Sequence, residues 1–233
     1  MRKGHAIALG CLAAIGHAGA AQVADYAFDH DLHSSIPGAP DLVAIGTGTA
    51  FASENVLGES DNVFTHAADS GLALAPMSAL LAEPGVYTIL MRVRHDEETN
   101  RLHVKYIDFA DGTDDAGLYD TAGTLNFYPL GSGTVSLINP GYVDIAITRD
   151  AAGTLAGYVN GLPQFVLDDS MSLGGVIDGS ETLRFVVDDE ATSGDESAAG
   201  AVARIRIWDT ALSPSEIAVL SIDRIFGDGF DGV

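Results

Sequence analysis

The sequence predicts an all-β protein, in which two antiparallel sheets pack as a jelly-roll sandwich and a short helix follows at the C-terminus. Two observations carry this prediction. Short runs of alternating apolar and polar residues recur along the chain between turns rich in Gly and Asp, which is typical of sandwiches and jelly rolls. Helical signals gather near the C-terminus, where Ser213, Pro214 and Glu216 have the spacing of a capped helix start.

Residues 1–21 are expected to be a signal peptide rather than part of the fold. Arg2 and Lys3 give a positive start, an apolar stretch follows, and Ala18-Gly19-Ala20 provides the small residues of a cleavage site. The apolar stretch is too short to cross a bilayer. Cleavage there would remove Cys11, the single cysteine, and leave a secreted protein without disulfides, in the periplasm, on the cell surface or in the medium.

Residues 22–221 are expected to form one domain, because no linker or change of composition divides them. The alternating runs predict strands at residues 86–94, 102–109, 118–119, 125–128, 143–148, 155–159, 164–167, 182–187 and 202–208. Asn160-Gly161 lies between two of these runs and predicts a two-residue hairpin, since both residues tolerate positive φ. The segment from residue 51 to residue 75 is less regular, and we assign no continuous set of strands to it.

The last predicted strand leads directly into the helix. Strict alternation would place Val202, Arg204, Arg206 and Trp208 on one face and Ala203, Ile205 and Ile207 on the other. Trp208, the single tryptophan, ends this strand just before the turn into the helix. We therefore expect it to pack between the sandwich and the helix, rather than to stack on a sugar.

The charge balance limits the classes of partner. The chain has 33 acidic and 11 basic residues and a formal net charge of −22. Nucleic acids and anionic bilayers are bound through clustered Lys and Arg, so neither is expected as a partner. The excess of carboxylates suits hard cations such as calcium, which prefer oxygen ligands.

Several motifs, taken in order, resemble the laminin G-like branch of the concanavalin A-like lectins and glucanases. Residues 26–38 resemble its opening strand, residues 145–161 its central hairpin, and residues 201–220 its closing strand and helix. Residues 107–119, together with the acidic segment from Asp188 to Glu196, resemble a bacterial secreted subgroup. The resemblance implies a jelly roll that binds sugars or proteins outside the cell, most often without catalysis.

Two acidic clusters are candidate metal sites. Asp188 and Asp189 with Glu196 offer carboxylates in a loop, which suits calcium, although the alternating spacing of a self-contained calcium loop is missing. The other interpretation is a solvated turn. Asp108 and Asp115 belong to a second acidic cluster, which either binds a cation, converges with the first cluster on one ion, or serves turn geometry. We favour turn geometry for this second cluster.

No catalytic constellation is recognisable, so we expect a binding protein rather than an enzyme. The strand-borne carboxylate pair of the glucanases is missing, and Glu54 and Glu59 are separated by apolar residues and Gly without an intervening Asp. The lyases on this fold need a Tyr/His pair in a basic groove, and His103 and Lys105 are expected merely to share a solvent face.

The favoured function is a lectin-like module that binds glycan with the assistance of calcium. The alternative is an adhesion protein of the cell surface or matrix that binds other proteins, and a glycoside hydrolase is the least favoured. Residues 222–233 form an acidic tail that carries Phe226 and Phe230. That tail is expected either to be recognised by a partner through its phenylalanines or to be a frayed terminus.

Overall fold

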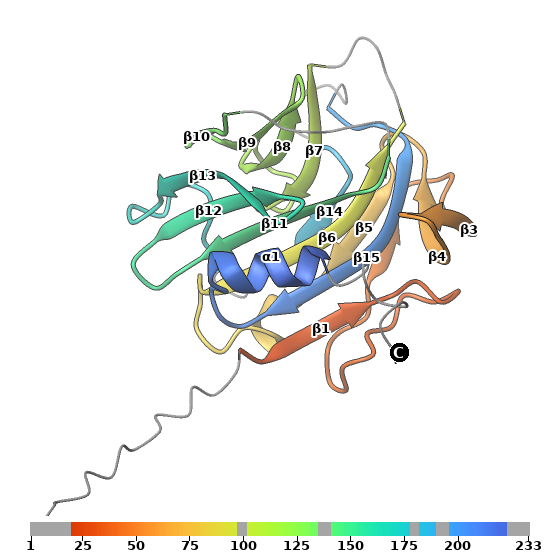
Figure 1. The fold of residues 1–233 in the computed structure, drawn as a ribbon, viewed down its shortest axis with the longest axis horizontal. Helices are drawn as coiled ribbons and strands as arrows, with labels where there is room; N and C mark the ends of the chain where they lie inside the picture. Colours follow the sequence, from red (N-terminus) through yellow and green to blue (C-terminus); the bar gives the residue numbers. More distant parts are fainter. Residues whose placement is uncertain (1–19, 97–101, 135–140, 178–181, 190–195, 223–233) are drawn as a thin grey trace, which may run out of the picture.

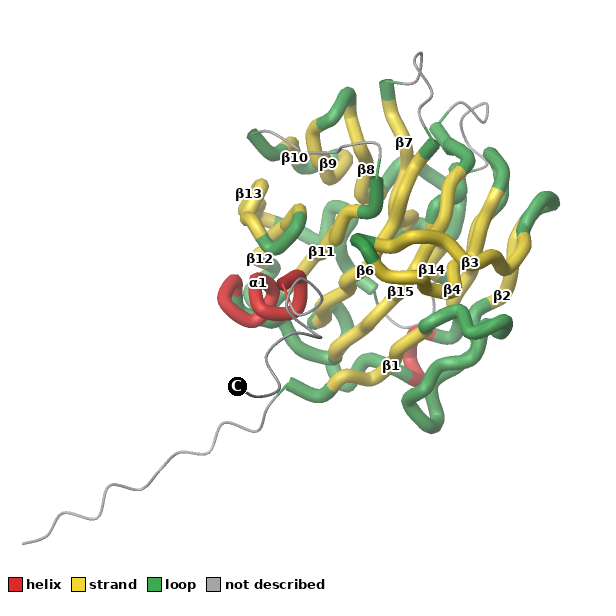
Figure 2. The backbone as a smooth tube through the Cα atoms, turned by 45° about the vertical axis from the view of Figure 1, so that its right-hand side comes forward, coloured by secondary structure: helices red, strands yellow, loops and turns green. Residues whose placement is uncertain are grey.

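Two antiparallel sheets packed face to face make up the protein, as seen in a computed structural model that describes residues 20–96, 102–134, 141–177, 182–189 and 196–222 (Figures 1 and 2). The predicted all-β sandwich is therefore confirmed. Most of the expected signal peptide and nearly all of the acidic tail lie outside the described residues. Within those residues, no helix is both long enough and apolar enough to span a bilayer.

The first sheet has eight strands. Its order is β13 (Leu162–Asp168), β12 (Thr154–Val159), β11 (Val143–Arg149), β6 (Tyr87–His95), β15 (Gly200–Trp208), β4 (Glu59–His66) and β3 (Ala50–Val56), with β1 (Gln22–Tyr26) paired to β15. The strands β6 and β15 lie at its centre and run antiparallel, with Ile205 opposite Met91 and Ile207 opposite Ile89.

The second sheet has seven strands and carries the candidate site. Its order is β10 (Gly131–Ser132), β9 (Thr124–Tyr128), β8 (Gly117–Thr121), β7 (His103–Asp108), β14 (Leu183–Phe185), β5 (Gly71–Leu74) and β2 (Val43–Ile45). A short 3-10 helix, η1 (Met77–Ala79), follows β5, and the α-helix α1 (Pro214–Ile222) follows β15.

The main core fills the space between the two sheets. Alternate residues of β6 and β15, among them Ile89, Met91 and Ile205, are fully buried there. They meet Leu118 of β8 and Phe127 of β9, which point inward from the second sheet. Because residues alternate along a strand, the neighbours of Leu118 and Phe127 in the sequence point to the outer face of the second sheet.

The expected strict alternation of the last strand is wrong at its beginning. A β-bulge lies between Val202 and Arg204 in the pairing of β15 with β6. Val202 packs in the main core with Ile205, whereas Ala203 packs in a separate cluster with Val63 of β4. The inserted residue shifts the alternation by one position, so a strict period of two does not hold across the bulge.

The helix α1 covers the outer face of the first sheet, as expected from its sequence (Figure 1). Trp208 is 5% exposed and packs with Leu212 and Ile217, and Leu220 lies against the same cluster. The Ser213 backbone N–H donates a 2.8 Å hydrogen bond to Glu216, and the Glu216 N–H donates one of 3.3 Å to the Ser213 hydroxyl. These reciprocal bonds form the predicted capping box, and the predicted burial of Trp208 is confirmed.

One hairpin was foreseen from the sequence and another was not. Asn160 and Gly161 connect β12 to β13 with φ of 49° and 77°. In the unassigned segment, Leu57 and Gly58 connect β3 to β4 with φ of 54° and 100°. Leucine is uncommon at positive φ, so residues 57–58 gave no turn signal that would have divided this segment into two strands.

Candidate functional site

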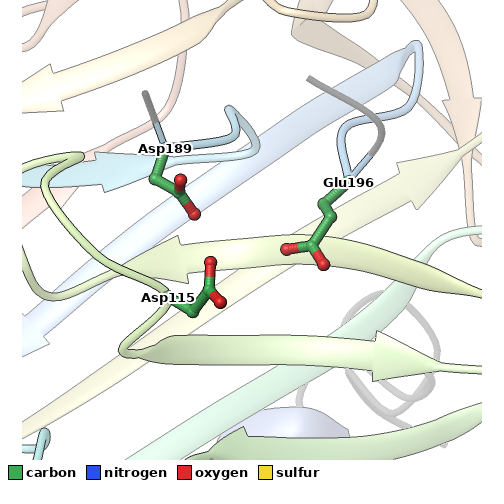
Figure 3. A group of neighbouring side chains, drawn as sticks. All are labelled: Asp115, Asp189 and Glu196. Atoms are coloured by element: carbon green, nitrogen blue, oxygen red, sulfur yellow. The ribbon is translucent and has the colours of Figure 1, made fainter. Parts of the chain in front are cut away.

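Three carboxylates from distant parts of the sequence meet at one end of the second sheet. Asp115, Asp189 and Glu196 each offer an oxygen, and these oxygens lie within 4.8 Å of one another. Figure 3 shows the three carboxyl groups turned toward a common centre. The cluster thus takes two residues of the first predicted metal site and one of the second, so the two acidic clusters converge in space.

The strand order of the second sheet explains this convergence. Asp115 lies in the turn before β8, Asp189 follows β14, and β7 runs between these two strands. Glu196 lies ahead of β15 and is held against β7 by a 2.8 Å hydrogen bond from the backbone N–H of Lys105 to its carbonyl oxygen. The site is therefore assembled around β7.

Lys105 lies beneath the carboxylates, and its expected position at the solvent face is wrong. Its side chain is fully buried, and its ammonium group donates hydrogen bonds to Asp189 (2.6 Å) and Asp108 (3.1 Å). The ammonium lies 5.1 Å from the centre of the Tyr119 ring. Burial lowers the pKa of Lys105, but hydrogen bonds and charges of Asp189 and Asp108 outweigh this effect and raise its pKa overall.

The other acidic residues of the two clusters have different roles. Asp188 accepts hydrogen bonds from the backbone N–H groups of Asp189 (2.8 Å) and Glu196 (3.2 Å), and so links Glu196 to the segment after β14 rather than joining the three carboxylates. Asp108 accepts from the backbone N–H of Gly112 (2.8 Å) in addition to its bond with Lys105. Asp114 accepts from the backbone of its own turn, which matches the turn geometry favoured for the second cluster.

The ammonium of Lys105 offsets only part of the repulsion among the three carboxylates. Burial raises the pKa of Asp115, and the adjacent carboxyl of Asp189 raises it further. Burial also raises the pKa of Glu196, and repulsion from Asp188 and Asp115 adds to the effect. Asp115 Oδ1 and Glu196 Oε2 are buried atoms without a hydrogen-bond partner. Like charges at close range disfavour ionisation, so a bound cation would relieve the repulsion and satisfy both oxygens.

A pocket of about 200 Å³ opens beside this cluster, on the outer face of the second sheet. Its lining comprises His103, Asp115, Tyr119, Thr121, Asn126, Tyr128 and Glu196. Tyr128 on β9 is 52% exposed, whereas Tyr119 is buried, so an exposed aromatic ring lies beside hydroxyl, amide and carboxylate groups. Sugars bind through this combination, because their apolar faces stack on rings while their hydroxyls form hydrogen bonds.

Sequence reasoning did not single out Thr121, Asn126 or Tyr128. The alternation on β8 and β9 was the available signal: Leu118, Leu125 and Phe127 point into the core. The residues on the opposite face of these two strands, Tyr119, Thr121, Asn126 and Tyr128, line the pocket. That signal identifies the outer face of a sheet, but it does not tell where on that face a pocket forms. The pocket depends on Asp115 and Glu196, which come from separate loops.

Other polar residues of the chain lie away from this site, among them two histidines after β1 and Glu54, which the sequence had already excluded as part of a glucanase pair. His30 and His33 are exposed in the loop after β1, where His33 contacts Asp41 at 2.7 Å. Glu54 pairs with Arg94 at 3.1 Å and accepts a 2.8 Å hydrogen bond from the Tyr142 hydroxyl. Glu54 is thus held in an ion pair on the outer face of the first sheet.

Comparison with solved structures shows the same fold in proteins of several kinds. Domain 4 of the extracellular arabinanase AbnA from Geobacillus stearothermophilus, solved with arabinotriose, has a TM-score of 0.64 at 18% identity, over 87% of this chain and 98% of that domain. A botulinum neurotoxin type C structure gives 0.58 at 12% identity, over 86% of this chain and 50% of that chain. A Trypanosoma rangeli sialidase gives 0.58 at 14%, over 83% and 34%.

At these identities the likeness shows the fold alone, and the neighbours include both binding domains and enzymes. No curated protein matches the chain in sequence. The sequence profile described as concanavalin A-like lectin/glucanases superfamily, a laminin G type, matches residues 66–218. This match spans most of the two sheets and includes Asp115, Asp189 and Glu196. The chain therefore belongs to the laminin G-like family of the concanavalin A-like lectin/glucanases superfamily.

Proposed function

We propose that this chain is a secreted, non-catalytic module that binds glycan in the pocket on the outer face of the second sheet, with calcium held at the pocket's edge. The observation that carries the proposal is the exposed ring of Tyr128 beside Asn126 and Thr121, next to carboxylates whose buried oxygens lack partners. Secretion rests on the features of a signal peptide in residues 1–21.

The solved neighbours support a sugar ligand. The arabinanase domain was solved with a bound arabinotriose, and the neurotoxin depends on interaction with two ganglioside molecules for cell entry. A non-catalytic role is supported by the way the acidic groups are used. Hydrolysis of a glycosidic bond needs a proton donor and a second carboxylate on opposite sides of the sugar, whereas Asp115, Asp189 and Glu196 converge on one point.

We expect Tyr128→Ala to weaken glycan binding about tenfold, because an aromatic contact contributes about 0.5–1.5 kcal/mol beyond the apolar area that it buries. A glycan array would identify the ligand, and isothermal titration with that glycan would compare the variant with the wild type. Val166→Ala is the matched control, since Val166 is 67% exposed on β13, outside the pocket lining. Equal affinities of the wild type and the Tyr128 variant would rule out this pocket as the glycan site.

A protein-binding function remains the second candidate, and one observation favours it. The edge strand β13 exposes Leu162 and Val166, at 57% and 67%, and exposed apolar edges favour pairing with another chain. If the partner is a protein docked on β13, Val166→Asp should abolish adhesion to it while Tyr128→Ala leaves adhesion unchanged. A glycan partner gives the opposite pattern.

Calcium is proposed to bind Asp115, Asp189 and Glu196, because hard cations prefer carboxylate oxygens. An extracellular site of this kind has a Kd on the order of 10⁻⁴–10⁻³ M. At a hundredfold excess over Kd, binding to the folded state alone adds about 2.7 kcal/mol of stability. Thermal melting in calcium and in chelator should therefore differ clearly for the wild type, with magnesium and sodium at matched ionic strength as controls for charge screening.

The calcium response should disappear in Asp115→Asn and persist in Asp114→Asn. Both changes remove one carboxylate charge from the same turn, but only Asp115 belongs to the converging cluster. A melting temperature that chelator does not change in the wild type would contradict the calcium part of the proposal. Glycan binding measured in chelator then decides whether the glycan part stands without the ion.

A further inference from the structure

Lys105 is the one lysine of the chain besides Lys3, and it is fully buried among carboxylates. Its ammonium group bonds to Asp189 at 2.6 Å and Asp108 at 3.1 Å, and lies 4.0 Å from Asp188. A lysine normally keeps its strongly hydrated ammonium in water, and its burial is costly unless carboxylates compensate the charge. In a chain with 33 acidic residues, this placement of a lysine calls for an explanation in terms of the site.

Asp189 is shared between two cation positions. One of its oxygens, Oδ2, accepts the hydrogen bond from Lys105, and its carboxyl group also converges with Asp115 and Glu196. The ammonium defines an inner position, enclosed by Asp108 and Asp189. The three converging carboxylates define an outer position, which borders the pocket through Asp115 and Glu196.

We propose that Lys105 is the resident cation of this two-position site, and that its charge sets the affinity of the outer position for calcium. This inference rests on the calcium part of the proposed function. The fixed ammonium gives Asp189 its position in the metal-free protein, so the pocket edge is formed before any ion binds. The same positive charge repels a dication at the outer position, because Coulomb interactions over a few ångströms are strong in a partly buried site.

The consequence is a weak, reversible site rather than a permanent structural one. With the ammonium in place, calcium adds to a cluster that is already partly neutralised, and the fold does not depend on the ion. Without the ammonium, the carboxylates of Asp108 and Asp189 lose their compensating charge. An incoming calcium ion would then supply that charge and be held more tightly, so Lys105 limits the calcium affinity of the outer position.

The test measures calcium alone, by isothermal titration and thermal melting, in the wild type and in Lys105→Met. We expect the variant to bind calcium at least tenfold more tightly and to melt lower than the wild type in chelator. Arg92→Met is the matched control, because Arg92 and Asp144 form a buried ion pair (2.7 Å) in the first sheet. It should lower the melting temperature in chelator without changing calcium affinity, which separates the charge effect from general destabilisation.

A double variant, Lys105→Met with Asp108→Asn, restores the wild-type charge balance of the cluster. The amide side chain introduced by Asp108→Asn keeps an oxygen that can accept the backbone hydrogen bond of Gly112, and we expect calcium affinity within about threefold of the wild type. Equal calcium affinity in the wild type and in Lys105→Met would overturn the inference, as would a Lys105→Met chain that stays unfolded in 10 mM calcium while Arg92→Met folds.

The wild-type and variant responses together separate this inference from the proposed function. If the wild type shows no calcium response and Lys105→Met gains one, the inference stands, and calcium assistance of the wild type fails. If neither chain responds to calcium, both fail. Glycan titration in chelator is independent of these outcomes, because it tests the pocket without the ion.

Discussion

Replacing Trp208 by alanine should lower the free energy of unfolding by about 3–5 kcal/mol, the range for removing a large aromatic side chain from a core. Trp208 is 5% exposed and closes the small core between α1 and the first sheet, where it packs with Leu90, Leu212 and Ile217. The Arg206 guanidinium lies 5.6 Å from the centre of its ring, so the substitution also removes a cation–π contact.

Urea unfolding followed by far-UV circular dichroism measures this effect, since the variant has no tryptophan to report by fluorescence. Val219→Ala on the same helix is the control: Val219 is 57% exposed, and its loss should change stability by less than about 1 kcal/mol. In the wild type, iodide should quench the tryptophan fluorescence poorly. Ready quenching in the folded protein, or a loss below about 1 kcal/mol in Trp208→Ala, would contradict the burial of the indole.

Acid should destabilise the protein as pH falls below about 6.5, because two imidazoles are shielded from water. His66 on β4 and His95 on β6 both lie opposite Gly200 of β15, and the His95 ring stacks on Tyr106 at 4.6 Å. Burial lowers the pKa of His66 to about 4 and that of His95 to about 3. His66 Nε2 and both ring nitrogens of His95 are buried without a hydrogen-bond partner.

The sign of the effect follows from which state binds the proton. Above about pH 6.5 both imidazoles are neutral in the folded and the unfolded chain, so neither affects stability. As pH falls below this value, the unfolded chain binds protons that the folded chain does not bind. The free energy of unfolding then falls by about 1.4 kcal/mol per pH unit for each ring. Stability should therefore fall by about 2 kcal/mol for each ring between pH 6.5 and pH 5.

Urea titrations at several pH values measure this slope. His95→Phe should remove about half of it, because phenylalanine keeps an aromatic ring against Tyr106 and does not titrate. His33→Gln is the control: His33 is exposed and its contact with Asp41 raises its pKa, so its loss should not reduce the acid-induced fall. Buried carboxylates with raised pKa, such as Asp188, act in the opposite direction, so the contribution of the histidines is the difference between the wild type and His95→Phe. An acid-induced fall that is the same in both would show that the His95 ring is accessible to water.

Local sequence determined several features without reference to the rest of the chain. The capping box at Ser213 and Glu216, the hairpin at Asn160-Gly161 and the burial of Trp208 each depend on interactions between near neighbours or on strong conformational preferences. The two-sheet architecture also followed from the alternation, because a strand with one apolar face must cover that face with another layer. The hairpin at Leu57-Gly58 was not predicted, because Leu57 adopts a positive φ, which is uncommon for leucine.

The candidate site forms only in the tertiary structure. The sequence named Asp188, Asp189 and Glu196, with Asp108 and Asp115 as a second group, but only the pairing of β7 with β8 and β14 brings Asp115 to Asp189 and Glu196. Lys105 looked like a solvent-facing residue next to His103. A charged side chain at an outward position can be exposed to water or buried against carboxylates. For Lys105 the outcome depends on residues 188–189 and 196, which are distant in the sequence, so no local pattern predicts it.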